Sequence, residues 1–356
     1  AENASREKNL LRNTRLVSGL PSGWNVTGRI NAHFSENEDV IFKTDESVKG
    51  PSGSPAFLID VLASEGVPSS YGWAQQVYVY SAPFKPTREE SHTASVYISG
   101  NGSGEFAVVG SNLSAAATQK FSVAEGEGWK RVSCTFRANS SEKHYALSFK
   151  LKGKFWLDGF QVNPGDKAAA FSPEFSAETA LAAADGELGA VRIHFDDETP
   201  SAAWTVLGAK AGDILKGKVF DLGGASANLS EVKLKGDKSE SGKWNYLLPG
   251  LGRYGQFRVE VRVENAAGAK LSDDNEMVFT RLHRPRYWGK DAPLSPFGVH
   301  IQPISSAIGM AKAFGINWVR LHDAGIQLVG WRFLENEPDT WRFFDKELDR
   351  YRRGNL

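Results

Sequence analysis

Short runs in which apolar and polar residues alternate fill the first 282 residues of this 356-residue chain. In the clearest run, Phe257-Arg-Val-Glu-Val-Arg-Val263, apolar side chains fall on one side of an extended strand and charged side chains on the other. Comparable runs lie at 56–61, 76–80, 94–98, 105–109, 131–136, 145–149 and 155–162. Clusters of Gly, Ser, Asn and Pro separate these runs, and the stretch Gly100–Gly104 is predicted to be a hairpin turn. The pattern predicts a mainly β protein built from antiparallel sandwiches.

Breaks in this pattern divide the chain into parts. Residues 9–175 are predicted to form an N-terminal jelly-roll β-sandwich, and residues 188–282 a second, immunoglobulin-like β-sandwich without a disulfide. Between them, residues 176–187 are rich in Ala and carry no packing stripe, so we predict a linker. A second linker is predicted at residues 283–295.

Beyond residue 296 the pattern changes from alternation to strand followed by helix. Residues 297–301 and 317–321 are short apolar strands, and residues 305–314 and 343–353 are predicted helices. Strand–helix repeats of this kind favour a parallel sheet, so we predict that residues 296–356 are the first two units of a truncated (β/α)8 barrel. Such a barrel needs about 250 residues, so this segment would hold only its opening.

The composition argues against several classes of partner. Lys plus Arg number 42 and Asp plus Glu also 42, which leaves no basic excess for nucleic acid. No apolar run approaches the roughly 18 residues of a membrane span. The single cysteine, Cys134, lies in an alternating run and is predicted to be a buried structural thiol. No cluster of Cys and His suits zinc, and no cofactor for catalysis is expected.

The first predicted domain carries three ordered motifs. They are Asn9-Leu-Leu-Arg-Asn13 with Gly19 and Trp24, then Trp129–Phe136, then Phe155–Val162 followed by Gly165, Ala168 and Phe171-Ser-Pro173. This order resembles carbohydrate-binding modules of the family 4, 9 and 22 type. The resemblance implies a jelly roll, a polysaccharide or oligosaccharide ligand, and a secreted or cell-surface location.

The same resemblance implies a structural calcium ion that ties the N-terminal segment to the last strand. Asp158 matches the acid of the closing strand, and calcium prefers such oxygen ligands. Many relatives have a second acid at the next position, where this chain has Gly159. A hydrogen-bonded or solvated Asp158 without calcium is the alternative.

Aromatic and amide side chains gather before and within the run at 76–80. Sugars present flat C–H faces and a rim of hydroxyls, so a binder needs exposed rings and planar polar groups. The candidate carbohydrate-binding residues are Trp73, Tyr71, Gln75 and Tyr78, with Tyr80 in the same cluster. Packing of the same rings in the core is the alternative.

The C-terminal segment resembles the start of a clan A glycoside hydrolase barrel. The residues that carry the resemblance are Phe297-Gly-Val-His300, the run Met310–Asp323, Trp331, Leu334–Pro338, Trp341 and Phe343-Phe-Asp345. By resemblance, Arg320 would support the nucleophilic carboxylate, and His300 and His322 would line the sugar subsite. The acid/base and the nucleophile of this family come from later strands, so they are expected beyond Leu356.

Three hypotheses follow. The first is the N-terminal part of a polysaccharide-degrading glycoside hydrolase, in which the first domain binds carbohydrate. The alternative is a non-catalytic carbohydrate-binding or adhesion protein of the cell surface, which accounts equally well for residues 1–282 but not for the barrel-like segment. In the third, the first domain has lost sugar binding and only packs against the barrel.

Overall fold

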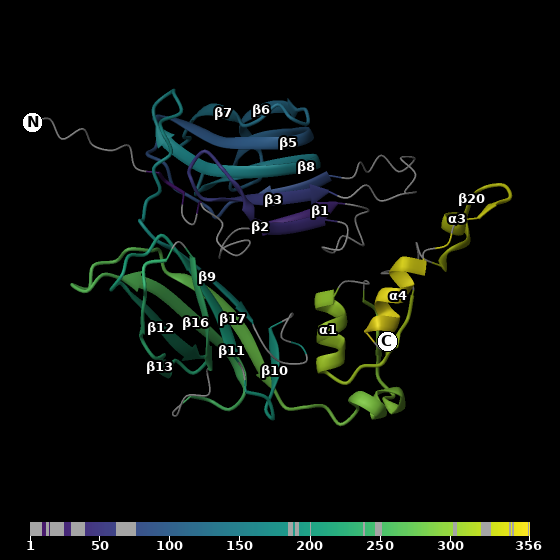
Figure 1. Cartoon of the computed structure of the whole chain (residues 1–356). Coiled ribbons are helices and arrows are strands. Elements are labelled where there is room, and N and C mark those ends of the chain that lie inside the picture. The colour runs from purple at the N-terminus through teal and green to yellow at the C-terminus, as the bar shows by residue number, and fades with distance from the viewer. Residues whose placement is uncertain are drawn as a thin grey trace, which may run out of the picture.

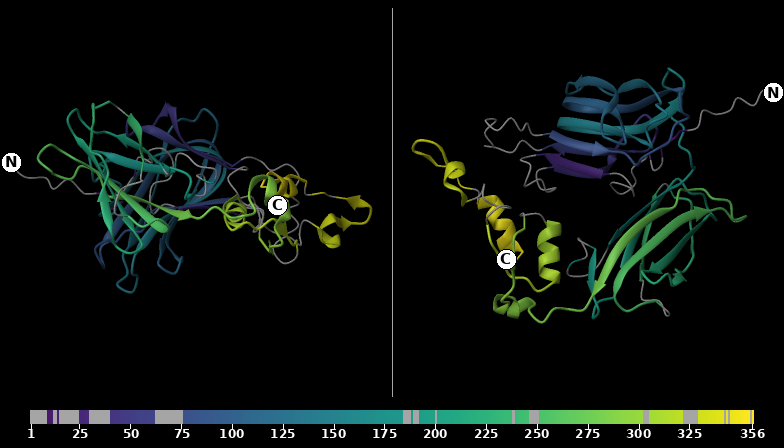
Figure 2. Two further views of the ribbon diagram at one scale, coloured as in Figure 1. Left: turned by 90° about the horizontal axis from the view of Figure 1, so that it is seen from below. Right: turned by 180° about the vertical axis from the view of Figure 1, so that it is seen from behind.

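The protein is mainly β and contains two sandwiches followed by a small C-terminal segment of mixed strands and helices (Figure 1). A computed structural model describes residues 9–11, 14, 25–29, 40–61, 76–183, 188, 192–199, 201–237, 239–245, 251–301, 305–321, 329–341, 343, 345–354 and 356. Both further views show the C-terminal segment to one side of the second sandwich (Figure 2). No described helix is long and apolar enough to cross a membrane.

Two long strands organise the first sandwich. Its strands are β1 (Asn25–Arg29), β2 (Val40–Lys49), β3 (Pro55–Val61), β4 (Gln76–Tyr80), β5 (Ser91–Gly110), β6 (Ala115–Val123), β7 (Lys130–Arg137) and β8 (Tyr145–Pro164). β5 and β8 have 20 residues each and pair with each other along their whole length. One half of each belongs to a layer ordered β2-β3-β8-β5-β7, and the other half to a layer ordered β1-β4-β8-β5-β6.

The crossing from one layer to the other occurs at three glycines. Gly100, Gly102 and Gly153 have φ angles of 135°, 146° and 124°, which side chains disfavour. A Cβ on any of them would lie only 2.1–2.3 Å from a carbonyl oxygen of the opposite strand. The predicted hairpin turn at Gly100–Gly104 is therefore wrong: β5 continues through it, and the glycines supply a bend where the two backbones approach closely.

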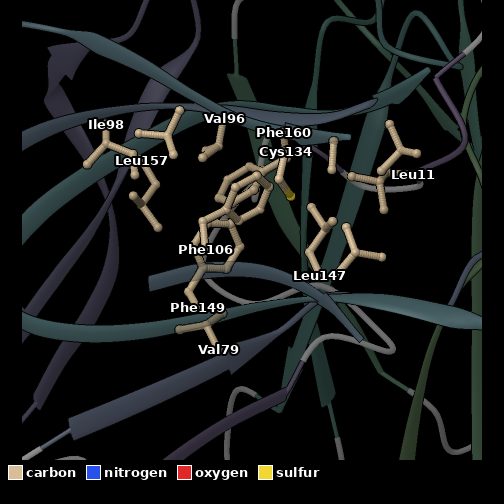
Figure 3. Close-up of a cluster of buried hydrophobic side chains, with 14 of the residues drawn as sticks. Leu11, Val79, Val96, Ile98, Phe106, Cys134, Leu147, Phe149, Leu157 and Phe160 are labelled. Carbon is tan, nitrogen blue, oxygen red and sulfur yellow. The ribbon is translucent and has the colours of Figure 1, made fainter. Parts of the chain in front are cut away.

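The two layers enclose one apolar core. Phe106 and Phe149 stack with ring centroids 4.9 Å apart, and Phe149 meets Phe160 edge to face at 5.6 Å (Figure 3). Cys134 is buried in the same cluster, as predicted, and burial raises the pKa of its thiol to about 12. Leu11, from the N-terminal segment, also joins this core.

Replacing Gly153 with Ala should destabilise the first sandwich by at least about 3 kcal/mol, because backbone overlap adds to a conformational cost of about 1–2 kcal/mol. Gly126→Ala is the matched control, since Gly126 has φ 79° but a Cβ there would meet nothing within 4 Å. Calorimetry of the full chain should show a much larger loss of melting temperature for Gly153→Ala. Equal losses would contradict the close-approach argument.

In the second sandwich two sheets pack face to face around a core of their own. Its strands are β9 (Glu178–Ala183), β10 (Ile193–Phe195), β11 (Ser201–Leu207), β12 (Ile214–Asp221), β13 (Ser226–Asn228), β14 (Val232–Lys233), β15 (Ser239–Asn245), β16 (Gly255–Glu264) and β17 (Asn275–Leu282). One sheet is ordered β10-β17-β16-β12-β13, with β14 beside β12, and the other β15-β11-β9. Trp204 and Trp244 from the smaller sheet pack in one cluster with Phe257 and Phe279 from the larger.

Part of the first predicted linker is a strand instead. Residues 178–183, within the predicted linker 176–187, form β9, which pairs antiparallel with β11. Leu181 lies opposite Trp204 and packs against the core, and Ala177 beside the strand is fully buried. The core side of the strand carries Thr179, opposite Val206, and Leu181, so only one large apolar residue points inward and no apolar stripe marks the strand in the sequence.

The second predicted linker, residues 283–295, is anchored to the second sandwich. The carboxylate of Asp196 accepts hydrogen bonds from His283 Nδ1 at 2.9 Å and from Tyr254 Oη at 3.0 Å. These bonds, that of His283 first, hold the pKa of Asp196 well below its usual range. Trp288 packs edge to face on Phe195, with ring centroids 4.7 Å apart.

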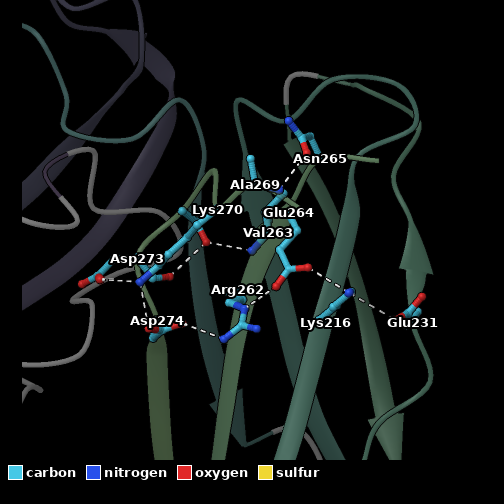
Figure 4. A network of polar contacts seen from close by, with 11 residues as sticks. Lys216, Glu231, Arg262, Val263, Glu264, Asn265, Ala269, Lys270, Asp273 and Asp274 are labelled. Carbon is cyan, nitrogen blue, oxygen red and sulfur yellow. Dashed lines mark hydrogen bonds and ion pairs between the residues drawn. The ribbon is translucent and has the colours of Figure 1, made fainter. Parts of the chain in front are cut away.

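A charged network closes one end of the second sandwich (Figure 4). The Glu264 side chain is only 8% exposed and pairs with Lys216 at 2.8 Å and with Arg262 at 2.6 Å. Lys270 joins Asp273 and Asp274 beside them, at 3.5 and 2.8 Å. Hydrogen bonds from Lys216 and then Arg262 lower the pKa of Glu264, so its ionised form stabilises the folded state.

Glu264→Gln should therefore reduce the stability of the second sandwich at pH 7 by about 1–3 kcal/mol. A carboxyl with a lowered folded-state pKa contributes stability above its unfolded pKa of about 4.3, and this contribution disappears as the pH falls. Urea unfolding of both proteins between pH 7 and pH 3 should show a gap that stays constant down to about pH 4.3 and narrows below it. A gap that widens toward low pH would contradict this account.

The C-terminal segment contains a strand–helix–strand unit. Its elements are the 3-10 helix η3 (Gly289–Leu294), β18 (Gly298–Val299), α1 (Ser305–Ala313), β19 (Trp318–Val319), α3 (Trp331–Leu334), β20 (Glu335–Glu337), β21 (Thr340–Trp341) and α4 (Asp345–Arg353). β18 and β19 pair in parallel, with α1 between them in the chain. Ile308 of α1 and Tyr351 of α4 share a small core, and Ala313 joins Phe195 of the second sandwich in another.

Candidate functional site

The N-terminal segment is tied to the last strand by an amide. The buried Asn9 donates from Nδ2 to the carbonyl of Phe160 at 2.9 Å, and its Oδ1 accepts from the backbone N–H of Val162 at 3.0 Å. Leu10 N–H also donates to the Val162 carbonyl at 2.9 Å. The first Asn of the opening sequence motif thus ties the start of the first sandwich to its last strand, β8.

One outer face of this sandwich is largely covered by the chain itself. Residues 165–172 follow β8 and turn back over the layer that contains β7. Gln161 and Asn163 are fully buried beneath them: Asn163 Oδ1 accepts from Ala169 N–H at 3.0 Å, and Gln161 Oε1 accepts from Ser172 N–H at 2.9 Å. The polar groups of this face are therefore used to hold the tail.

The remaining side of that face carries Trp156, which is half-buried. Its indole N–H donates to Asp45 Oδ2 at 2.9 Å, and the ammonium of Lys154 lies 5.1 Å from the centre of its ring. Lys154 also pairs with Asp60 at 3.6 Å. The ring is thus engaged by protein groups along its edge and on one face.

The opposite outer face belongs to the layer ordered β1-β4-β8-β5-β6. Because core residues alternate with outward ones, the strand register defines its rows. One row runs Thr118, Ala107, Ser148 and Tyr80, and the next runs Lys120, Glu105 and Lys150. Lys152 follows Lys150 on β8, opposite Ser103. We call the surface formed by Tyr80, Glu105, Ala107, Lys120, Ser148, Lys150 and Lys152 the lysine face.

The lysine face has a floor of small residues beside a tyrosine. Ala107 is 5% and Ser148 8% exposed, whereas Tyr80 and Lys150 are half-buried and Lys120 and Lys152 are exposed. Both small residues are nearly buried, so the accessible part of the face consists of Tyr80, Glu105 and the lysines. Tyr80 offers an aromatic surface, and Glu105 and the lysines offer groups that bond hydroxyls or anions. This arrangement suits non-covalent binding.

The predicted carbohydrate-binding residues lie in β4 or just before it in the sequence. Tyr71, Trp73 and Gln75 immediately precede β4 and lie outside the described residues. Tyr78 lies in β4, where the register places it opposite Lys150 and Thr27. The sequence did not single out Lys150, Lys120 and Glu105, which come from β8, β6 and β5. In the sequence each of them alternates with core residues, which indicates an outward side chain. Only the strand register shows that the three lie in one row.

The predicted barrel residues follow the two parallel strands. His300 comes directly after β18 and Arg320 directly after β19, and both are exposed. Since Val299 lies opposite Val319, the two residues leave the sheet at the same edge, and Arg320 N–H donates to the Val299 carbonyl at 3.2 Å. His322 lies outside the described residues.

A hollow of about 690 Å³ lies between η3, β19 and α4. Its lining is mainly apolar and includes Trp318, Leu321, Leu348 and Tyr351. Tyr351 donates its hydroxyl proton to the Ile301 carbonyl at 2.6 Å, and burial raises its pKa to about 12. This hollow offers no arrangement of carboxylates for hydrolysis.

Asp158 anchors a hairpin turn. Its Oδ2 accepts from the backbone N–H of Ser52 at 2.7 Å, and its Oδ1 accepts from the Ser52 hydroxyl at 2.6 Å. A Cβ on Gly50 would lie 2.1 Å from the same carboxylate, so the turn packs directly against it. Within the described ranges no group of three or more His, Cys, Asp or Glu side chains is suited to a metal ion. The calcium ion stays a prediction of the resemblance.

No protein-family model matches the chain, and no curated protein matches it. Several solved structures are similar to parts of it. The enzymatically active domain of tailspike protein 4 from bacteriophage CBA120 matches at 9% identity and TM-score 0.30, over 40% of this chain and 20% of that one. A Stig cyclase from Fischerella sp. matches at 10% and 0.34, over 46% and 100%. TmCBM61 in complex with β-1,4-galactotriose matches at 12% and 0.33, over 44% and 99%. At these identities and TM-scores the similarities carry no argument about this chain.

Removing divalent cations distinguishes the two roles of Asp158. If its carboxylate acts through Ser52, EDTA should leave the melting temperature of the first sandwich unchanged, whereas Asp158→Asn should lower its stability by about 1–3 kcal/mol. Calorimetry of wild type and variant with EDTA and with added calcium measures both effects. A fall in the wild-type melting temperature with EDTA that calcium reverses, and that the variant lacks, would establish the metal site instead.

Proposed function

We propose that residues 9–175 bind polysaccharide through the lysine face and the segment that precedes β4. The observation that carries this proposal is a difference between the two outer faces of the first sandwich: the described part of the chain covers much of one face but not the other. The tail buries Gln161 and Asn163 on one face, and Trp156 beside them is engaged by Asp45 and Lys154. The other face presents Tyr80 beside the small residues Ala107 and Ser148.

The chemistry of this face fits a sugar chain. A pyranose ring packs its C–H surface on an aromatic ring and places its hydroxyls near polar groups at the edge. Tyr80 supplies the ring, and Glu105 and Lys150 in the adjacent row supply an acceptor and a donor. Trp73 and Tyr71 precede the same strand by only a few residues, so they are proposed to extend the aromatic surface.

We further propose that the C-terminal segment is the opening of a glycoside hydrolase barrel. Support comes from the parallel pairing of β18 with β19, from α1 between them, and from the shared edge at which His300 and Arg320 leave the sheet. In barrels of this class, that edge carries the active site. The parent protein would hydrolyse a polysaccharide held nearby by the first sandwich, whose tether raises the effective concentration of substrate. The alternative of a surface adhesin leaves this strand–helix–strand unit without a role.

Tyr80→Ala and Trp73→Ala should each weaken polysaccharide binding by about tenfold, or about 1.4 kcal/mol, through loss of ring stacking. Affinity electrophoresis of the full chain through xylan, β-glucan, mannan, agar and alginate measures the retardation. Tyr254→Ala is the control, since Tyr254 is a partly exposed tyrosine of the second sandwich. Absence of retardation in every polysaccharide would reject the binding proposal and favour a packing role for the first sandwich.

A further inference from the structure

We propose that the ligand of the lysine face is an anionic polysaccharide, one that carries uronic acid carboxylates or sulfate esters. This inference rests on the proposed carbohydrate binding and names the substrate class of the same site. It follows from the position, the partners and the surroundings of three lysines.

The three lysines converge on one surface from two strands. Lys150 and Lys152 are two residues apart on β8, so they point to the same side about 7 Å from each other. Lys120 lies on β6, two strands away through Glu105, at a strand separation of about 10 Å. Tyr80, on the neighbouring β4, borders the same group.

Within the described part of the chain these three lysines have no acidic partner, in contrast to Lys216 and Lys270 of the second sandwich. Elsewhere, Lys216 pairs with Glu264 at 2.8 Å and Lys270 pairs with Asp274 at 2.8 Å. Among the residues that the structure describes, Lys120, Lys150 and Lys152 form no ion pair within 4 Å. Their ammonium groups are therefore available to a ligand without the loss of an internal salt bridge.

The surroundings leave a local excess of positive charge. Glu105 is the acidic residue within the two rows and lies opposite both Lys120 and Lys150, but outside ion-pair distance of each. The other members of the face, Tyr80, Ala107 and Ser148, are uncharged at neutral pH. Three lysines with one glutamate make a cationic face on a chain whose total formal charge is zero.

An anionic polysaccharide matches this arrangement in two ways. Its sugar rings can lie against Tyr80, and its regularly repeated anions can meet successive lysines along and across the strands. Each lysine ammonium is a compact charge with three donors on a flexible stem, which suits carboxylate and sulfate oxygens alike. Neutral glycans would gain hydrogen bonds from the lysines but no charge attraction.

The test compares polymers of different charge by affinity electrophoresis and calorimetry with the full chain. Alginate and polygalacturonate supply carboxylates, carrageenan supplies sulfate esters, and agarose, mannan and β-glucan are neutral. We expect binding to at least one anionic polymer, with affinity that falls as salt rises from about 0.02 to 0.2 M because screening weakens the attraction. Which anionic polymer binds distinguishes a carboxylate from a sulfate ligand.

Lys150→Gln and Lys120→Gln should each reduce affinity for that polymer about fivefold and flatten its salt dependence. Lys43→Gln is the matched control, because Lys43 is an exposed lysine opposite Leu58 on the other outer face. Polyglutamate is the control for charge alone. Unchanged melting curves should confirm that the variants remain folded.

The outcomes separate this inference from the proposed function. Binding to neutral polymers only, with the lysine variants unchanged, would overturn the anionic ligand and leave carbohydrate binding in place. Equal binding to polyglutamate would show charge attraction without sugar recognition and would also overturn it. Failure to bind any polymer would reject the proposed function and this inference together.

Discussion

The first sandwich depends on how closely β5 and β8 approach each other at their bend. At Gly100, Gly102 and Gly153 a side chain would overlap a carbonyl oxygen of the opposite strand. Because these positions lack side chains, two long strands can leave one layer and enter the other without breaking their pairing. The core between the layers then forms from both halves of the same two strands, as the contacts of Phe149 with Phe106 and Phe160 show. The bend also creates two outer faces with separate uses.

The difference between those faces follows from the cost of buried polar groups. Gln161 and Asn163 point outward from β8, and their amides are fully buried because the tail supplies hydrogen-bond partners. A ligand that displaced the tail would have to replace the hydrogen bonds that the tail now makes to these amides. On the lysine face the same strand presents Lys150 and Lys152, for which no described residue supplies an ion pair. One strand therefore uses one half for internal cohesion and offers the other half to solvent.

Local alternation predicted most strands and the burial of Cys134, because apolar periodicity records which side of a strand meets the core. The alternation gave wrong predictions where contacts between distant parts of the chain determine the strand boundaries. The runs at 94–98 and 105–109 belong to one strand, since Gly100 and Gly102 bend it without ending it. β9 was predicted to be a linker because Leu181, opposite Trp204, is the one large apolar residue that it packs against the core. The lysine face was missed because Lys120 and Lys150 become neighbours only through the register with Glu105.

Ion pairs occur in both sandwiches, for example between Lys154 and Asp60 in the first and around Glu264 in the second. In the second, Glu264 is nearly buried and draws Lys216 and Arg262 into a network that stabilises the fold. Because Lys216 and Arg262 are paired with Glu264, their charges are largely neutralised and would attract a ligand only weakly. Exposed lysines like Lys120 and Lys152 cost little to leave in water, and they contribute little to stability. A folded domain gains almost nothing from gathering such lysines beside Tyr80, whereas a ligand with repeated anions gains from each of them. The clustering is therefore better explained by recognition than by stability.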